Sequence, residues 1–185
     1  MKLRNRFIAA MTALAIPMTV APAAADSTYG WIERMRIEPW GVEVSAKLDT
    51  GARTSSIHAT GIDRFERDGQ EWVRFTVSIT DENRAQTVRR EFERPLFRNI
   101  VVRGAGGMDR RPVVLMNICA GDGTYEEQFS LNDRSDMLYP VLIGRRTIKH
   151  LGVVDVTRTF LSEPTCGTRS HVQVEEDAGK EDVEA

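Results

Sequence analysis

The sequence is poor in the residues from which metal sites are usually built, with only two cysteines and three histidines among 185 residues. His58, His150 and His171 show no H-E-x-x-H spacing, and the cysteines form no C-x-x-C pair. The sequence also lacks a G-x-x-x-x-G-K-[ST] phosphate loop. We therefore expect neither zinc nor ATP as a cofactor.

Long apolar runs and an excess of basic charge are also lacking. Beyond residue 25, no apolar run approaches the ~20 residues that a membrane helix needs. The formal net charge is -2, which leaves no basic footprint for nucleic acid. We expect no nucleic-acid partner, and no membrane span in the chain beyond residue 25.

Residues 1–25 have the composition of a secretory signal peptide. Three basic residues open the chain, an apolar stretch follows, and a small-x-small pattern ends at Ala25. Cleavage there predicts an exported protein, periplasmic or secreted, and its three lost basic residues take the net charge from -2 to -5. An uncleaved anchor is the alternative, but the run is short for a span.

The mature chain predicts one domain, residues 26–170, and a tail, residues 171–185. The tail holds six acids and one lysine without an aromatic residue, a composition typical of disorder. Cys119 and Cys166 are a candidate disulfide in an oxidising compartment, and two free buried thiols are the alternative.

Most of the mature chain alternates apolar and polar residues with the period of a β-strand. The clearest case is residues 71–79. Its apolar face consists of Val73, Phe75, Val77 and Ile79. Only residues 139–152 favour a strand that continues as a short helix. This pattern predicts a mainly β fold, as a small barrel or a sandwich.

Glycine-rich turns at residues 104–110 and 120–123 predict two β-hairpins. The first turn is also a candidate flap over a substrate, with an ordinary hairpin as the alternative. Its glycines are Gly104, Gly106 and Gly107. Residues 64–71 and 81–95 are highly charged and predict solvated loops or edge strands.

One short motif carries chemistry: Asp49-Thr50-Gly51-Ala52, directly after a strand-like run. Peptide hydrolysis by carboxylates needs one ionised and one protonated carboxyl with a water between them. The glycine lets the backbone turn close to the carboxylate. The chain has a single such motif, and two copies of the chain on a two-fold axis could each give one Asp49 to form the pair. A simple polar turn is the alternative.

A second segment strengthens this interpretation, because an apolar run followed by Gly144 and Arg145 lies far downstream of the motif. With residues 46–59, 110–114, 131–146 and 152–161, the chain resembles the retropepsin-like family whose members carry the name ATP-dependent zinc protease. The resemblance covers roughly residues 30–161, most of the mature chain.

The resemblance implies a small closed acid-protease β barrel with a short C-terminal helix. It implies an aspartic endopeptidase that acts on peptide or protein substrates as a homodimer. It also implies that Asp49 is the catalytic carboxylate, with Thr50 and Gly51 completing its loop. The residues expected to support this loop are Ala52, Leu142, Ile143, Gly144 and Arg145.

The sequence departs from the retroviral pattern at Arg53, where an acid that pairs with the Gly-Arg arginine is common. The partner of Arg145 is therefore open. Asp155 is the other carboxylate in an apolar strand and the candidate for a carboxylate pair within one chain, but it lacks the turn chemistry of Asp49. Two further function classes stay open: a catalytically silent peptide-binding module of the cell envelope, and a metal-dependent hydrolase.

Overall fold

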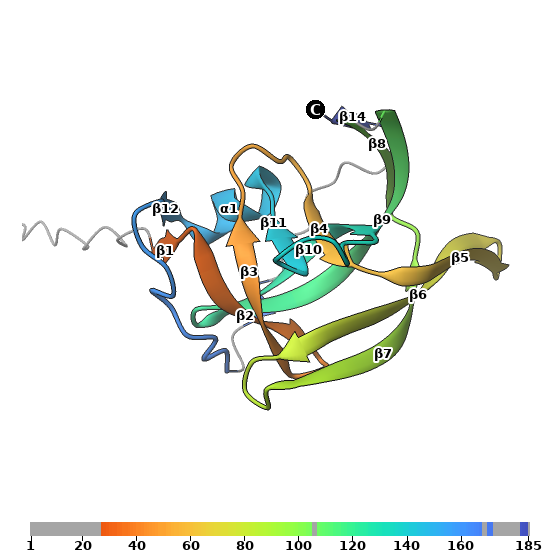
Figure 1. Ribbon diagram of the computed structural model, residues 1–185. Coiled ribbons are helices and arrows are strands. Elements are labelled where there is room, and N and C mark those ends of the chain that lie inside the picture. The colour runs from red at the N-terminus through yellow and green to blue at the C-terminus, as the bar shows by residue number, and fades with distance from the viewer. Residues whose placement is uncertain (1–26, 105–106, 168–169, 172–181, 185) are drawn as a thin grey trace, which may run out of the picture.

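The computed structural model describes residues 27–104, 107–167, 170–171 and 182–184 (Figure 1). The predicted signal peptide, residues 1–25, lies outside this part of the chain, as does most of the predicted acidic tail. Of that tail the structure describes His171 and Asp182–Glu184, two short strand segments. No helix in the described part is long and apolar enough to cross a membrane.

Strands make up most of the described residues. They are β1 (Thr28–Gly30), β2 (Ile32–Glu38), β3 (Val42–Leu48), β4 (Ser55–His58), β5 (Thr60–Arg67), β6 (Gln70–Asp81), β7 (Gln86–Pro95), β8 (Arg98–Gly104), β9 (Gly107–Ala120), β10 (Gly123–Asn132), β11 (Val141–Ile143), β12 (Val153–Asp155), β13 (Ser170–His171) and β14 (Asp182–Glu184). One helix, α1 (Arg145–Leu151), follows β11 directly. The predicted mainly β class with one short helix is confirmed.

The strands form three sheets, and the largest has the order β13-β10-β4-β11-β3-β2-β9-β8-β14. An additional pairing between β10 and β9 joins six of these strands in a circuit. The strands of this circuit range from three residues in β11 to 14 in β9. β5, β6 and β7 pair among themselves as a separate sheet. Because β5, β6 and β7 stay outside the circuit and its strands differ so much in length, the described strands do not form the regular closed barrel that the resemblance implies.

The separate sheet follows the charge pattern of the sequence. The apolar face of β6 is buried, with Phe75 fully so. The charged runs on either side form β5 and β7, the two edges of this sheet. Charged edge strands resist pairing with other chains. The β5–β6 turn uses Asp68 and Gly69, both at positive φ, where glycine has no steric cost.

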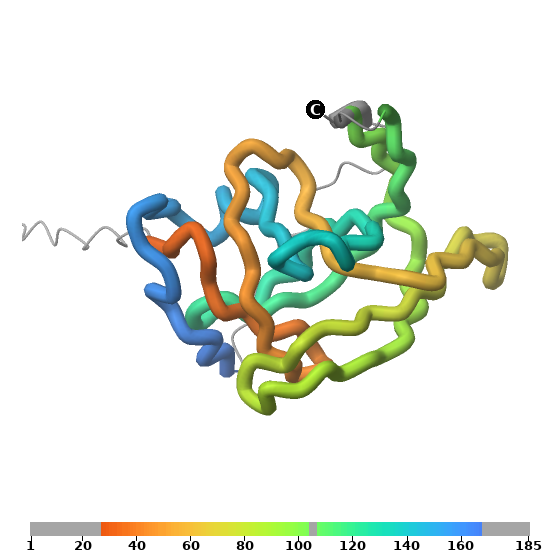
Figure 2. Tube along the Cα trace, viewed as in Figure 1, coloured from red at the N-terminus to blue at the C-terminus, as the bar shows by residue number. Residues whose placement is uncertain are grey.

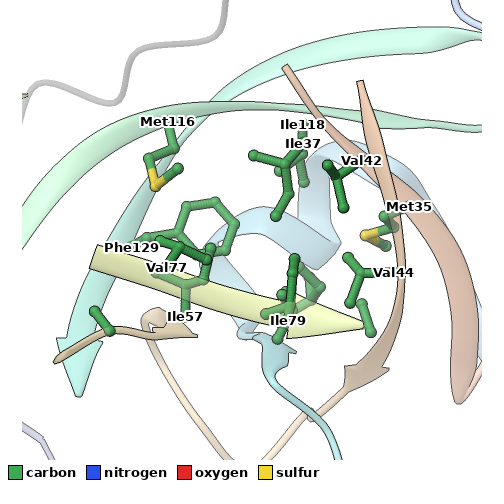
Figure 3. Close-up of a cluster of buried hydrophobic side chains, with 14 of the residues drawn as sticks. Met35, Ile37, Val42, Val44, Ile57, Val77, Ile79, Met116, Ile118 and Phe129 are labelled. Atoms are coloured by element: carbon green, nitrogen blue, oxygen red, sulfur yellow. The ribbon is translucent and has the colours of Figure 1, made fainter. Parts of the chain in front are cut away.

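The core lies between the large sheet and β6. Figure 3 shows its apolar side chains converging from β2, β3, β4, β6, β9 and β10. All of the labelled side chains are 3 % exposed or less: Met35, Ile37, Val42, Val44, Ile57, Val77, Ile79, Met116, Ile118 and Phe129. Burial of side chains of this size contributes about 1.5–3 kcal/mol each. The core therefore fixes β3, which leads directly into Asp49.

The segment after β12 returns along the N-terminal strands, as Figure 2 shows in blue. Backbone hydrogen bonds join Trp31 to Arg158 and Phe160 to Ile32. At its far end a disulfide between Cys119 and Cys166, with Cα atoms 5.8 Å apart, ties this segment to the end of β9. Both cysteines of the chain are used in this bond.

Replacing both Cys119 and Cys166 by serine is expected to lower the free energy of unfolding by about 3–4 kcal/mol. The bond closes a loop across 47 positions, and the loss of that loop closure enlarges the entropy of the unfolded chain. Urea unfolding of the oxidised chain and of the double variant measures the difference. Coincident transitions would mean that hydrogen bonds alone hold the returning segment.

Candidate active site

Asp49 stands at the first position after β3, with its backbone fixed by a strand far away in the sequence. Its N–H donates to the carbonyl of Ile143 in β11 at 2.8 Å. The N–H of Gly51 donates to Asp49 Oδ1 at 2.9 Å, which turns the loop around the carboxylate. A Cβ on residue 51 would lie 3.1 Å from that oxygen. A glycine here therefore permits the close approach, as the motif predicts.

β11 lies between the two arms of the Asp49 loop. It runs parallel to β3, pairing Ile143 with Leu48, and antiparallel to β4, pairing Leu142 with Ser56. Ile143 is completely buried, and Leu142 is partly buried. An apolar three-residue strand in this place holds both ends of the loop in one sheet. Figure 1 shows β11 beside β3 and β4 beneath the connecting loop.

Gly144 lets the chain after β11 press against the Asp49 loop. A Cβ at this position would lie 2.7 Å from the carbonyl oxygen of Arg53. The first N–H groups of α1 then donate back to the loop, from Arg145 to Ala52 at 2.9 Å and from Arg146 to Arg53 at 3.1 Å. These free N–H groups at a helix start need external acceptors. The loop carbonyls supply them.

The side chain of Arg145 also supports the loop, and the structure shows the partners that the sequence left open. Its Nη1 donates to the carbonyl oxygens of Thr50 at 2.8 Å and Gly51 at 3.2 Å. The arginine therefore buttresses the loop through backbone acceptors, where the retroviral pattern would use an acid. Thr50, Gly51 and Arg145 are all exposed in the single chain.

A buried chain of hydrogen bonds behind the loop was missed by sequence reasoning. Gly144 N–H donates to Ser55 Oγ, which bonds to Thr147 Oγ1 at 2.8 Å. Thr147 Oγ1 donates to Glu127 Oε2 at 3.1 Å, and Glu127 Oε1 bonds to His150 Nδ1 at 2.6 Å. Glu127 is only 4 % exposed. The sole sequence signal was a carboxylate within the apolar alternation of β10.

Cations surround the carboxylate of Asp49. Lys47 Nζ lies 3.4 Å from Asp49 Oδ2. Arg134, which is 7 % exposed, interacts electrostatically with Asp49 and with Arg111 in β9. Burial acts to raise the pKa of Asp49, but hydrogen bonds from the loop N–H groups and the Lys47 ammonium outweigh it and leave that pKa below its usual value.

Arg134 also lines a pocket of about 470 Å³ between β3, β6 and the segment that follows β10. Apolar and hydroxyl side chains make up much of the wall, including Val44, Ser45, Met137, Leu138 and Tyr139. His58 lies in this wall as well, and its Nδ1 accepts the backbone N–H of Arg134 at 3.0 Å. The pocket and Asp49 thus share one arginine between them.

The remaining predicted residues lie elsewhere or outside the described part. Gly104 and Gly107 pair at the end of the β8–β9 hairpin, and Gly106 lies outside the described residues. The flap therefore stays a prediction. Asp155 uses its carboxylate to close its own turn, with Thr157 and Arg158.

The donor set for a metal ion does not come together in the part of the chain that the structure describes. In residues 27–104, 107–167, 170–171 and 182–184, no three His, Cys, Asp or Glu side chains gather at metal-binding distances. The described residues thus do not fit the zinc of the family name, and no catalytic step is assigned to a metal here.

The fold and the site define a mainly β protein with an aspartate loop held by an apolar-Gly strand. A family model described as RimB-like, retropepsin-like aspartic endopeptidase RimB, matches residues 28–165. This match spans most of the chain, and the protein belongs to this family.

Curated relatives share this region under a different name. A probable alpha-L-glutamate ligase of Shewanella halifaxensis is 32% identical over 133 residues, which are 72% of this chain and 28% of that protein. One from Desulfotalea psychrophila is 32% identical over 113 residues, covering 60% of this chain and 24% of that protein. The match spans about a quarter of these relatives, so their named activity belongs to much longer chains.

A solved structure from Legionella pneumophila subsp. pneumophila str. Philadelphia 1 has the same fold. That protein, described as having unknown function, superimposes with a TM-score of 0.63 and 33% sequence identity. The match covers 75% of this chain and all of that one. The fold is therefore also found in a chain that consists of this region alone.

Proposed function

We propose that the protein is an aspartic endopeptidase in which Asp49 is the catalytic carboxylate. The observation that carries the proposal is the anchoring of this residue. Its Oδ1 accepts the N–H of Gly51 at 2.9 Å, and its own N–H is bound to β11. A carboxylate fixed in this manner, with Oδ2 turned toward solvent-accessible Lys47, is suited to act on a water molecule.

The second carboxyl in the proposal comes from Asp49 of a second copy. One Asp49 carboxylate removes a proton from water while the water oxygen bonds to the scissile carbonyl carbon. The other carboxyl gives its proton to the carbonyl oxygen. The C–N bond then breaks: the protonated carboxyl gives its proton to the leaving amine, the ionised carboxyl takes one from a hydroxyl of the diol, and the pair regains its single shared proton. The single motif and the exposed Thr50 and Gly51 support a homodimer that covers this loop.

The proposal places the mature protein in the periplasm or outside the cell. Its support is the pattern of residues 1–25, with a basic start, an apolar stretch and a small-x-small end. The Cys119–Cys166 disulfide is in keeping with an oxidising compartment.

For the substrate, we favour peptides with carboxylate side chains close to the scissile bond. Lys47 and Arg134 place positive charge near Asp49. Opposite charge across a binding surface gives specificity and faster association. The name of the curated relatives, alpha-L-glutamate ligase, makes glutamate-rich peptides the first to include.

The test is a digest of a mixed peptide library that includes glutamate-rich members, from acidic to neutral pH, with and without a chelator. The chain from residue 26 onward is compared with its Asp49→Asn variant, and products are identified by mass spectrometry. We expect cleavage that the chelator leaves unchanged and the variant lacks. Cleavage lost with the chelator would establish a metal-dependent hydrolase instead. No cleavage at any pH would favour a silent peptide-binding module.

A further inference from the structure

We propose that Lys47 is a positioning residue that confines peptide cleavage to acidic pH, by pairing with Asp49 in each copy of the dimer. This inference rests on the proposed function, because it concerns the same carboxyl pair. It adds the regulation of the site by pH and names the residue responsible.

The geometry directs Lys47 at the reacting oxygen. Lys47 is the second-last residue of β3 and Asp49 follows the strand directly, so the two positions lie on the same face. Oδ1 of Asp49 is taken by the N–H of Gly51, and Lys47 Nζ lies 3.4 Å from the other oxygen, Oδ2. Lys47 pairs in register with Leu142 of β11 on one side and with Ile32 of β2 on the other, so its backbone is held on both sides.

Other cations lie near the loop. Arg134, in the segment after β10, acts electrostatically on Asp49, and Arg111 of β9 acts on Arg134. Arg145, at the start of α1, binds the carbonyls of the Asp49 loop, and Arg53 belongs to the loop itself.

Two acids near these cations each have a partner of their own. Asp109 pairs with Arg111, and Asp133 lies 3.5 Å from His58. The two charged groups that act on the Asp49 carboxylate in the described part of the chain, Lys47 and Arg134, are both cationic.

Positive charge beside each carboxylate changes the pH range in which the pair holds its shared proton. Two carboxylates at close range retain a shared proton because two negative charges repel each other. An ammonium group 3.4 Å from one oxygen offsets part of this repulsion, and the dimer brings two such groups. The shared proton is then lost at a lower pH than in an uncompensated pair. The lowered pKa of Asp49 in the single chain agrees with this.

The experiment is the pH profile of kcat/KM for the wild-type chain and for Lys47→Met, with Lys47→Arg as the control that keeps the charge. Because Lys47 is partly exposed, with 39% of its side chain accessible, the Met variant is expected to fold normally. Lys47→Gln provides a second neutral variant. Removal of an opposite charge at this distance is expected to move both limbs of the profile to higher pH, by about one pH unit.

The expected result is a gain of activity in the Met and Gln variants on the basic limb. A shift of one pH unit corresponds there to about tenfold faster cleavage than wild type at the same pH. Lys47→Arg is expected to follow the wild-type profile. A ¹³C NMR titration of the Asp49 carboxyl should show the same upward shift in the neutral variants.

Unchanged limbs with a uniform loss of activity in the Met and Gln variants would overturn this inference. Such a result would assign Lys47 to the polarisation of the scissile carbonyl. If Asp49→Asn retained cleavage, the proposed function itself would fail. If Asp49→Asn were inactive and the limbs did not move, only the role of Lys47 would be wrong. No cleavage by wild type at any pH would overturn both.

Discussion

An Asp49→Asn chain is expected to cleave peptides at least about 1,000-fold more slowly than the wild-type chain, a loss of ~4 kcal/mol of transition-state stabilisation. An amide does not take a proton from water, and two amides do not share one. The loop itself should persist, because the Asn side-chain oxygen can accept the Gly51 N–H that Asp49 Oδ1 accepts. Initial rates on one defined peptide measure the loss. An unchanged thermal melting curve shows that the fold is intact.

Mixing the two chains tests whether the site is shared. If each active pair needs Asp49 from two copies, a tenfold excess of the Asn chain leaves only about a tenth of the wild-type chains paired with each other. Activity per wild-type chain is expected to fall in that proportion once the chains have exchanged. Activity that does not change with the excess would place a complete site in one chain.

Replacing Glu33 by alanine is expected to destabilise the protein by about 3–5 kcal/mol, because the change empties a buried set of charged hydrogen bonds. Glu33 is 0% exposed. Its carboxylate accepts the N–H groups of Leu161 at 2.9 Å and of Ser162 at 3.0 Å, and it also accepts the N–H of Gly30. These bonds attach the returning C-terminal segment to β2. Urea unfolding followed by fluorescence measures the change.

A matched control lies in the same segment. Glu163 pairs with Arg34 at 2.7 Å, but its side chain is 60% exposed. Exposed pairs contribute about 0–1 kcal/mol, so Glu163→Ala should have little effect. Equal losses for the two variants would show that the segment is not held through the buried carboxylate. The expectation would also be contradicted if Glu33→Ala changed the fluorescence of the folded protein without lowering the urea midpoint.

Local patterns in the sequence predicted the elements well where one side chain in two is buried. The alternation around Phe75 placed β6 and its buried face correctly, and the glycine turns placed the β8–β9 and β9–β10 hairpins. The apolar strand expected around Asp155 proved short. Only Val153–Asp155 is a strand there, because Asp155 closes a turn with Thr157 and Arg158.

The Asp49 loop shows where sequence reasoning ended. The motif and the apolar-Gly segment identified two pieces that lie together in the structure, with Asp49 N–H bound to Ile143. The acceptors for Arg145 were not predictable, since backbone carbonyls carry no signature in the sequence. Glu127 was overlooked for a related reason. Its partners, Thr147 and His150, come from a helix about 20 residues away.

The sequence by itself determined the mainly β class, the family resemblance and the identity of the candidate catalytic carboxylate. These depend on local alternation, turn chemistry and short motifs. Only the tertiary structure decided what surrounds that carboxylate: the Lys47 pair, the proximity of Arg134 and the buried contacts behind the loop. Distances between residues far apart in the chain are set by how the strands pair and pack, and charge and hydrogen bonding at the site depend on those distances.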